Sequence, residues 1–130
     1  MEFRRGRVDQ PVLPGSKVGS TTGDVLLDTV LKAEGISVNY AVFHPGARSF
    51  WHSHERGQLF FVDSGKGLIA TRDEAQVIQA GDIVWTPPGE EHWHGASLDA
   101  FVTYRAISLG VSTFNMAVTE EEFAQAWVRP

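Results

Sequence analysis

Short apolar runs separated by glycine and proline dominate the hydrophobic pattern of the chain. The runs are rich in β-branched and apolar residues, and turn sequences such as Pro45-Gly46 and Pro87-Pro88-Gly89 stand between them. This pattern predicts strands over Val25–Leu31, Ser37–His44, Phe50–His54, Gln58–Val62, Gly67–Thr71, Ala75–Gln79, Ile83–Thr86, His92–Gly95 and Phe101–Leu109. Short strands with such spacing indicate an all-β fold, an antiparallel sandwich or barrel.

The two ends of the chain differ from this pattern. Residues 1–22 hold several arginines followed by prolines and glycines, which predicts a solvated N-terminal arm before a single domain over 23–130. Near the C-terminus, Thr119 and Glu122 have the spacing of a capping box, and the apolar residues after them share one helical face. A short C-terminal helix is therefore expected.

Composition narrows the class of protein. The 130 residues are 42% hydrophobic and 21% charged, as in one ordinary globular domain. Cysteine is absent, which excludes disulfides, thiolate metal sites and cysteine nucleophiles. The net charge of −5 argues against nucleic acid or an anionic membrane as a partner. With no apolar run of spanning length and no leader-like start, we expect a cytoplasmic protein.

Histidines carry the candidate chemistry. All five lie between positions 44 and 94, and four form the pairs His52-Ser53-His54 and His92-Trp93-His94. Residues i and i+2 of a strand share a face, so each pair can aim two imidazoles at one ion. Gln58 can return to the same point across the turn after His54. Buried imidazoles without partners are costly, and a shared metal ion would satisfy them.

Two segments resemble the sequence motifs of the cupin superfamily. The first contains Gly46, His52, His54, Gln58 and Gly65, and the second contains Gly81, Pro87, Gly89 and His92. Two motifs in the right order are far more specific than one His-x-His. The resemblance implies a cupin β-barrel, or jelly roll, of antiparallel strands, usually dimeric, with a divalent metal held between the motifs.

Two positions depart from the usual motifs. Gln58 stands where cupins commonly have glutamate, and Ala96 stands where the second motif commonly ends in asparagine. Three neutral imidazoles and an amide oxygen leave a bound ion its full charge, which a carboxylate would partly neutralise. Such an ion is a stronger Lewis acid and favours an anionic ligand. Manganese, iron, cobalt, nickel and zinc all suit these ligands.

A narrower resemblance is to small single-domain bacterial cupins that include the manganese-dependent hydroxynitrile lyases. They share the glutamine and the segment His92-Trp93-His94-Gly95. This resemblance implies that manganese is the favoured metal and that its ligands are His52, His54, Gln58 and His92. It further implies that His94 is a free acid/base. It places Asn39, Ala41 and Ser108 at the substrate pocket.

These implications favour a metal-dependent lyase acting on a small molecule. It would cleave an α-hydroxy compound such as a cyanohydrin to an aldehyde and cyanide, with His94 taking the hydroxyl proton. The alternatives are a quercetinase-like dioxygenase and a non-catalytic cupin that binds a small ligand, with sugar isomerisation a weaker fourth. Gln58 favours Lewis-acid work, because a carboxylate is the more usual partner for O₂ activation.

Overall fold

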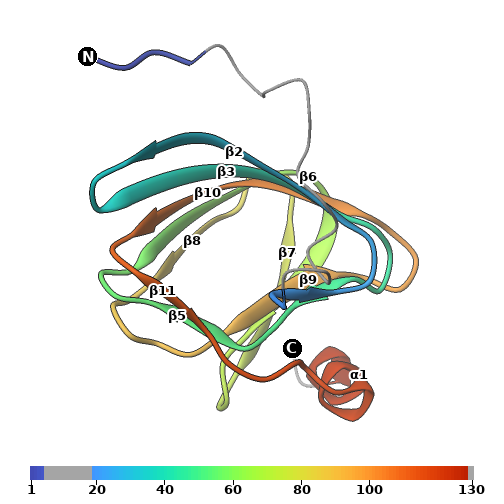
Figure 1. Cartoon of the computed structure of the whole chain (residues 1–130). Coiled ribbons are helices and arrows are strands. Elements are labelled where there is room, and N and C mark those ends of the chain that lie inside the picture. The colour runs from blue at the N-terminus through green and yellow to red at the C-terminus, as the bar shows by residue number, and fades with distance from the viewer. Residues whose placement is uncertain (5–18, 129–130) are drawn as a thin grey trace.

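Antiparallel strands make up most of the regular structure of the computed structural model, which describes residues 1–4 and 19–128 (Figure 1). The strands are β1 (Thr21–Thr22), β2 (Val25–Ala33), β3 (Ile36–Phe43), β4 (Arg48–Ser49), β5 (His52–His54), β6 (Gln58–Ala70), β7 (Ala75–Gln79), β8 (Ile83–Thr86), β9 (Trp93–Ala96), β10 (Val102–Leu109) and β11 (Ser112–Phe114). One helix, α1 (Glu120–Val128), follows them. Most of the predicted N-terminal arm lies outside the described residues, and β1 forms at the end of that arm.

The longest strand, β6, connects the two walls of the barrel. The larger sheet has nine strands in the order β1-β4-β9-β6-β10-β3-β2, and β7 and β8 also pair with β6. The first part of β6 pairs with β8 and β10, whereas its last part pairs with β7 and β9. Strands β11 and β5 form a second sheet. All these pairings are antiparallel, which confirms the predicted all-β barrel.

One predicted turn is wrong. Ser64-Gly65-Lys66-Gly67 lies inside β6 rather than between two strands. The register between β10 and β6 shifts between Thr103 and Tyr104, which marks a β-bulge. Gly65 has a φ of 83° and packs directly on the backbone of Phe101, where a Cβ would clash. The bulge leaves Asp63 unpaired, and with the glycine two residues later it lets the strand continue from one wall to the other instead of ending at a turn.

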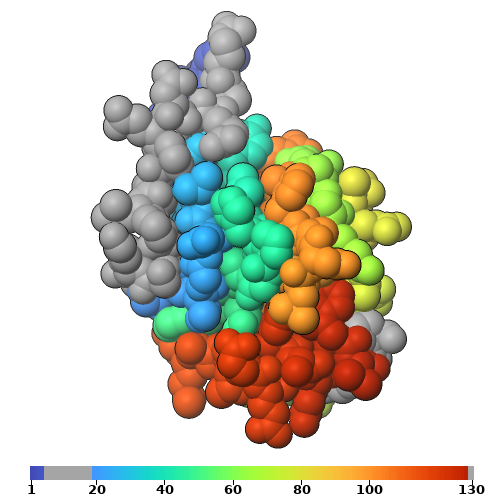
Figure 2. Space-filling view, turned by 90° about the vertical axis from the view of Figure 1, so that its right-hand side faces the viewer, coloured from blue at the N-terminus to red at the C-terminus, as the bar shows by residue number. Residues whose placement is uncertain are grey.

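Two apolar clusters hold the molecule together. The larger one fills the barrel and includes Phe43, Phe60, Val62, Val102 and Tyr104. The smaller one joins the barrel to α1 and consists of Trp51, Leu68, Ala70, Trp93, Val118, Phe123 and Ala126. The helix therefore packs on the barrel of its own chain, and Figure 2 shows the C-terminal segment, in red, covering one end of the molecule. Within the described ranges, no helix is long and apolar enough to cross a membrane.

The start of α1 is fixed by the predicted capping box and by a buried arginine. Thr119 N donates to Glu122 Oε1 and Glu122 N donates to Thr119 Oγ1, both at 3.0 Å, which confirms the capping box. The Arg48 guanidinium, from β4, donates to the Val118 carbonyl at 3.0 and 3.2 Å and to Glu120 at 2.9 Å. Because Arg48 is only 4% exposed, its two bonds to Val118 link the barrel wall to the helix away from water, whereas the Glu120 carboxylate is solvent-exposed.

The variant Arg48→Met keeps an apolar stem of similar length but removes the donors. We expect its free energy of unfolding to fall by about 2 kcal/mol, because the buried Val118 carbonyl loses a charged partner. Urea titration measures this change. The control Glu120→Gln breaks only the solvent-exposed ion pair and should cost less than about 1 kcal/mol. Equal stability of Arg48→Met and the unmodified chain would contradict this account of the helix.

Candidate metal centre

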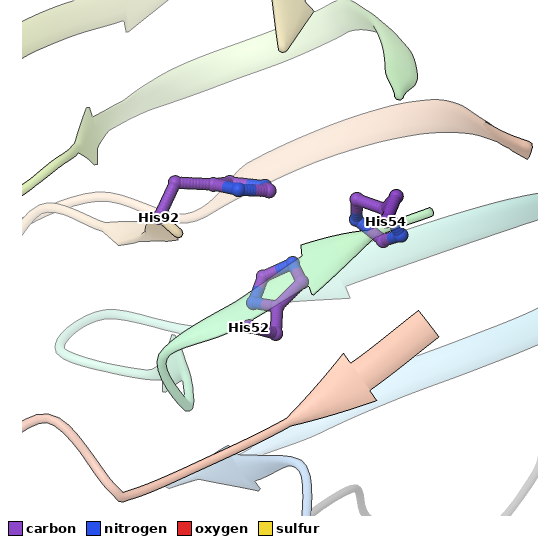
Figure 3. A group of neighbouring side chains, drawn as sticks. All are labelled: His52, His54 and His92. Carbon is purple, nitrogen blue, oxygen red and sulfur yellow. The ribbon is translucent and has the colours of Figure 1, made fainter. Parts of the chain in front are cut away.

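Strand pairing brings the two histidine motifs together. His52 and His92 exchange backbone N–H···O hydrogen bonds, both of 2.9 Å, across an antiparallel bridge. His54 lies two residues further along β5, on the same face as His52. One ring nitrogen from each of His52, His54 and His92 lies within 4.8 Å of the other two. Figure 3 shows the three rings grouped around one space, two from β5 and His92 from the neighbouring segment.

A tight glycine turn places Gln58 beside these rings. Gly57 has a φ of 99°, and a Cβ there would meet the Trp85 ring and lie 2.9 Å from the Thr86 carbonyl oxygen. Glycine is therefore required for the reversal from β5 to β6. Gln58 is buried, and its Nε2 donates to Ser108 Oγ at 3.1 Å. Its carbonyl oxygen, Oε1, is buried without a hydrogen-bond partner among the described residues.

The second nitrogen of each imidazole is already bonded. Nδ1 lies 2.8 Å from the Phe50 carbonyl oxygen in His52 and 3.0 Å from the Glu90 carbonyl oxygen in His92. His54 Nδ1 lies 2.8 Å from Ser112 Oγ. A ring that donates from Nδ1 to a carbonyl keeps its lone pair on Nε2. In the described part of the chain, Nε2 of His54 and of His92 is buried without a partner.

These unpartnered atoms fit a divalent transition metal. Imidazole nitrogens and an amide oxygen are suitable ligands for such ions, and an ion would satisfy lone pairs that are otherwise costly to bury. The bonded second nitrogens hold the rings in orientation, as in known metal sites. The residues that would hold the ion are His52, His54, His92 and Gln58.

Burial keeps the cluster in its metal-binding form. Loss of solvation lowers the pKa of His52 well below its ordinary value and also lowers the pKa of His92. It lowers the pKa of His54 to about 4, with a contribution from the neighbouring His92 and a smaller opposing one from the Gln58 side chain beside the ring. Metals bind neutral imidazole, and the lowered pKa values keep the three rings neutral at pH 7. A metal therefore does not have to displace protons to bind there.

His94 lies beside the cluster with a different partner. Its ring centre is 5.1 Å from that of His52 and 6.0 Å from that of His92. Its Nδ1 lies 2.5 Å from the Tyr104 hydroxyl oxygen. Burial, followed by the nearby histidines, lowers the pKa of His94, and burial raises the pKa of Tyr104. Both groups are therefore neutral at pH 7 and joined by a hydrogen bond.

A cavity of about 370 Å³ opens beside the cluster. Its wall contains His52, His54, Gln58 and His94. Of the three residues predicted for the substrate pocket, Asn39 and Ser108 lie in this wall. Ala41 faces Tyr104 in the strand register and packs in the barrel core instead. Ala41 is not among the described residues that line the cavity.

Some residues that support the site escaped the sequence analysis. The Ser112 hydroxyl bonds to the His54 ring from β11, a short strand with no apolar run by which it could have been predicted. Phe114, also in β11, stacks on the His52 ring with centres 5.0 Å apart. Tyr104 could have been predicted from the sequence, because side chains alternate along β10 and Tyr104 shares a strand face with Ser108.

Comparison with known proteins assigns the family. The model of the Cupin_2 family, described as a cupin domain, matches residues 39–103, half of the chain. The chain is a cupin. A crystal structure of a cupin-like protein from Thermotoga maritima superposes with a TM-score of 0.80 and 32% identity, and the match covers 97% of this chain and 96% of that one. A polyketide cyclase from Streptomyces resistomycificus shares the fold, with a TM-score of 0.71 and 15% identity over 98% of this chain and 94% of that one.

Two curated relatives of this cupin are enzymes by name. An (R)-mandelonitrile lyase from Granulicella tundricola is 43% identical over 93 residues, which cover 66% of this chain and 69% of that protein. An acireductone dioxygenase from Frankia alni is 28% identical over 108 residues, which cover 64% of this chain. The match spans about half of the dioxygenase, 52% of its length.

The lowered histidine pKa values predict how pH affects the metal-free protein. Below pH 6.5 the histidines of the unfolded chain become protonated, whereas those of the folded cluster stay neutral. The free energy of unfolding therefore falls as the pH is lowered. For His54 the loss continues down to its folded pKa of about 4. Urea titrations at pH 7.5, 6 and 5 should give steadily lower stability. The control His44→Gln removes an exposed histidine outside the cluster and should keep this trend. Stability that is the same at pH 5 and pH 7.5 would contradict the description of the cluster.

Proposed function

We propose that this cupin is a metal-dependent lyase that cleaves a small cyanohydrin-like compound to an aldehyde and cyanide, and also runs the reverse reaction. The observation that carries the proposal is a cluster of four neutral ligand residues, His52, His54, His92 and Gln58, beside a separately bonded His94. The similarity to a mandelonitrile lyase supports the same reaction class. A bound divalent ion, with manganese favoured, supplies a Lewis acid that stabilises developing negative charge.

In this proposal His94 transfers the proton. The base needs the tautomer in which Nδ1–H donates to the Tyr104 oxygen, because this leaves a lone pair on Nε2. Nε2 takes the hydroxyl proton as the carbonyl forms, and the carbon–carbon bond breaks with its electron pair leaving on cyanide. The proton on Nε2 then passes to cyanide, so the products are an aldehyde and hydrogen cyanide and His94 is restored.

The cavity wall supplies polar contacts for the substrate. Asn39 accepts a hydrogen bond of 2.6 Å from Thr29 Oγ1, which fixes the amide in the wall. Ser108 accepts a hydrogen bond from the amide of Gln58, one of the residues that would hold the metal. We propose that Asn39 and Ser108 contact the substrate, whereas Ala41 acts only through its packing behind Tyr104.

A dioxygenase is the second candidate, because one relative is an acireductone dioxygenase. The neutral ligand set favours the lyase, since no carboxylate is available in the cluster to support O₂ activation. Measuring O₂ uptake separates the two reactions, because the lyase consumes none. The homodimer or higher homo-oligomer and the cytoplasmic location expected from the sequence stay predictions.

The variant His94→Ala tests the proton-transfer step. We expect the purified variant to keep the metal content of the unmodified protein but to lose at least about 100-fold in turnover of mandelonitrile, the usual size of a general-base effect. Elemental analysis and an aldehyde-release assay measure the two quantities. Tyr104→Phe removes only the hydroxyl that orients His94 and should lower kcat by a smaller factor. Full activity of His94→Ala would refute the mechanism.

A further inference from the structure

One row of the strand register leads from the metal cluster to the outside of the cavity. Gln58 in β6 lies opposite Ser108 in β10, Ser108 lies opposite Ser37 in β3, and Ser37 lies opposite Lys32 in β2. All four residues line the cavity. Gln58 is buried at one end of the row, whereas Lys32 is exposed at the other. Lys32 therefore stands at the mouth of the cavity that the cluster closes.

The cavity wall carries positive charge without compensation. Its described residues include no aspartate or glutamate, and Lys32 is the one permanently charged side chain among them. Lys32 forms no salt bridge with any described residue. An unpaired ammonium group beside a neutral, polar wall attracts anions.

We propose that Lys32 binds an anionic group at the far end of the substrate. The substrate is then a bifunctional small molecule, with its reacting hydroxyl end at the cluster and a carboxylate or similar group at Lys32. This inference rests on the proposed function only in taking the cluster as the reacting end.

The spacing of the row sets the length of this molecule. Three steps between neighbouring strands separate the backbones of Gln58 and Lys32 by about 14 Å. Both residues line the cavity, and each side chain covers part of this distance. Ser37 and Asn39 lie between the two ends and offer hydrogen bonds along the way. The anionic group is therefore separated from the reacting carbon, not attached to it.

Two hydroxy acids with the same head group test this inference. Both 2-hydroxyglutarate and 2-hydroxybutanoate present an α-hydroxy acid to the cluster, but only the first has a distant carboxylate. We expect the manganese-loaded protein to bind 2-hydroxyglutarate about fivefold more tightly at low salt, near the upper end of what an exposed ion pair contributes. Isothermal titration calorimetry measures both dissociation constants without turnover.

A matched pair of variants assigns the preference to Lys32. Lys32→Met should bind the two acids equally, whereas Lys66→Met removes the same charge from an exposed site outside the cavity and should keep the fivefold preference. A preference that survives in Lys32→Met, or is lost equally in Lys66→Met, overturns the inference. A preference that is lost only in Lys32→Met supports the inference even if the protein does not cleave mandelonitrile. A failure of the lyase proposal can therefore be told apart from a failure of this inference.

Discussion

The cost of burying lone pairs without a partner governs this structure. Nε2 of His54 and of His92 and Oε1 of Gln58 are buried without a well-formed hydrogen bond to any described residue, and the Gln58 side chain lies close enough to His54 to affect its pKa. Each of these atoms would be solvated in the unfolded chain, so their burial opposes folding unless they share a cation. A divalent ion would satisfy all of them at once, and it accounts for the three histidines and the glutamine that the barrel buries together at this site.

The fold supplies the geometry that such an ion needs. Reciprocal backbone bonds between His52 and His92 hold the two motifs together, and the close approach of β4 and β9 extends this contact. At Gly95 a Cβ would lie only 2.6 Å from the Ala47 carbonyl oxygen, so a side chain there would push the strands apart. The Arg48 contact with Val118 then seals the same wall from the helix side. Precise ligand placement is thus a consequence of strand pairing.

Local sequence patterns predicted those features that depend on neighbouring residues. The strands β7 and β8, the capping box of α1 and the shared faces of the His-x-His pairs all follow from spacing along the chain. Features that depend on distant residues could not be predicted in this way. Ser112 meets His54 across 58 positions, and Arg48 meets Val118 across 70. The turn predicted at Gly65 was wrong because a glycine with positive φ also fits inside a long strand, here next to a bulge at Asp63.

Metal content is the most direct test of this account. Manganese titrated into metal-free protein, with the bound ion located by anomalous X-ray scattering, should show one ion per chain between His52, His54, His92 and Gln58. The variants His54→Ala and Gln58→Ala should bind it more weakly, because each removes one ligand. An ion at that position with these four ligands is the predicted result. A vacant position in crystals grown with excess manganese would contradict the central claim.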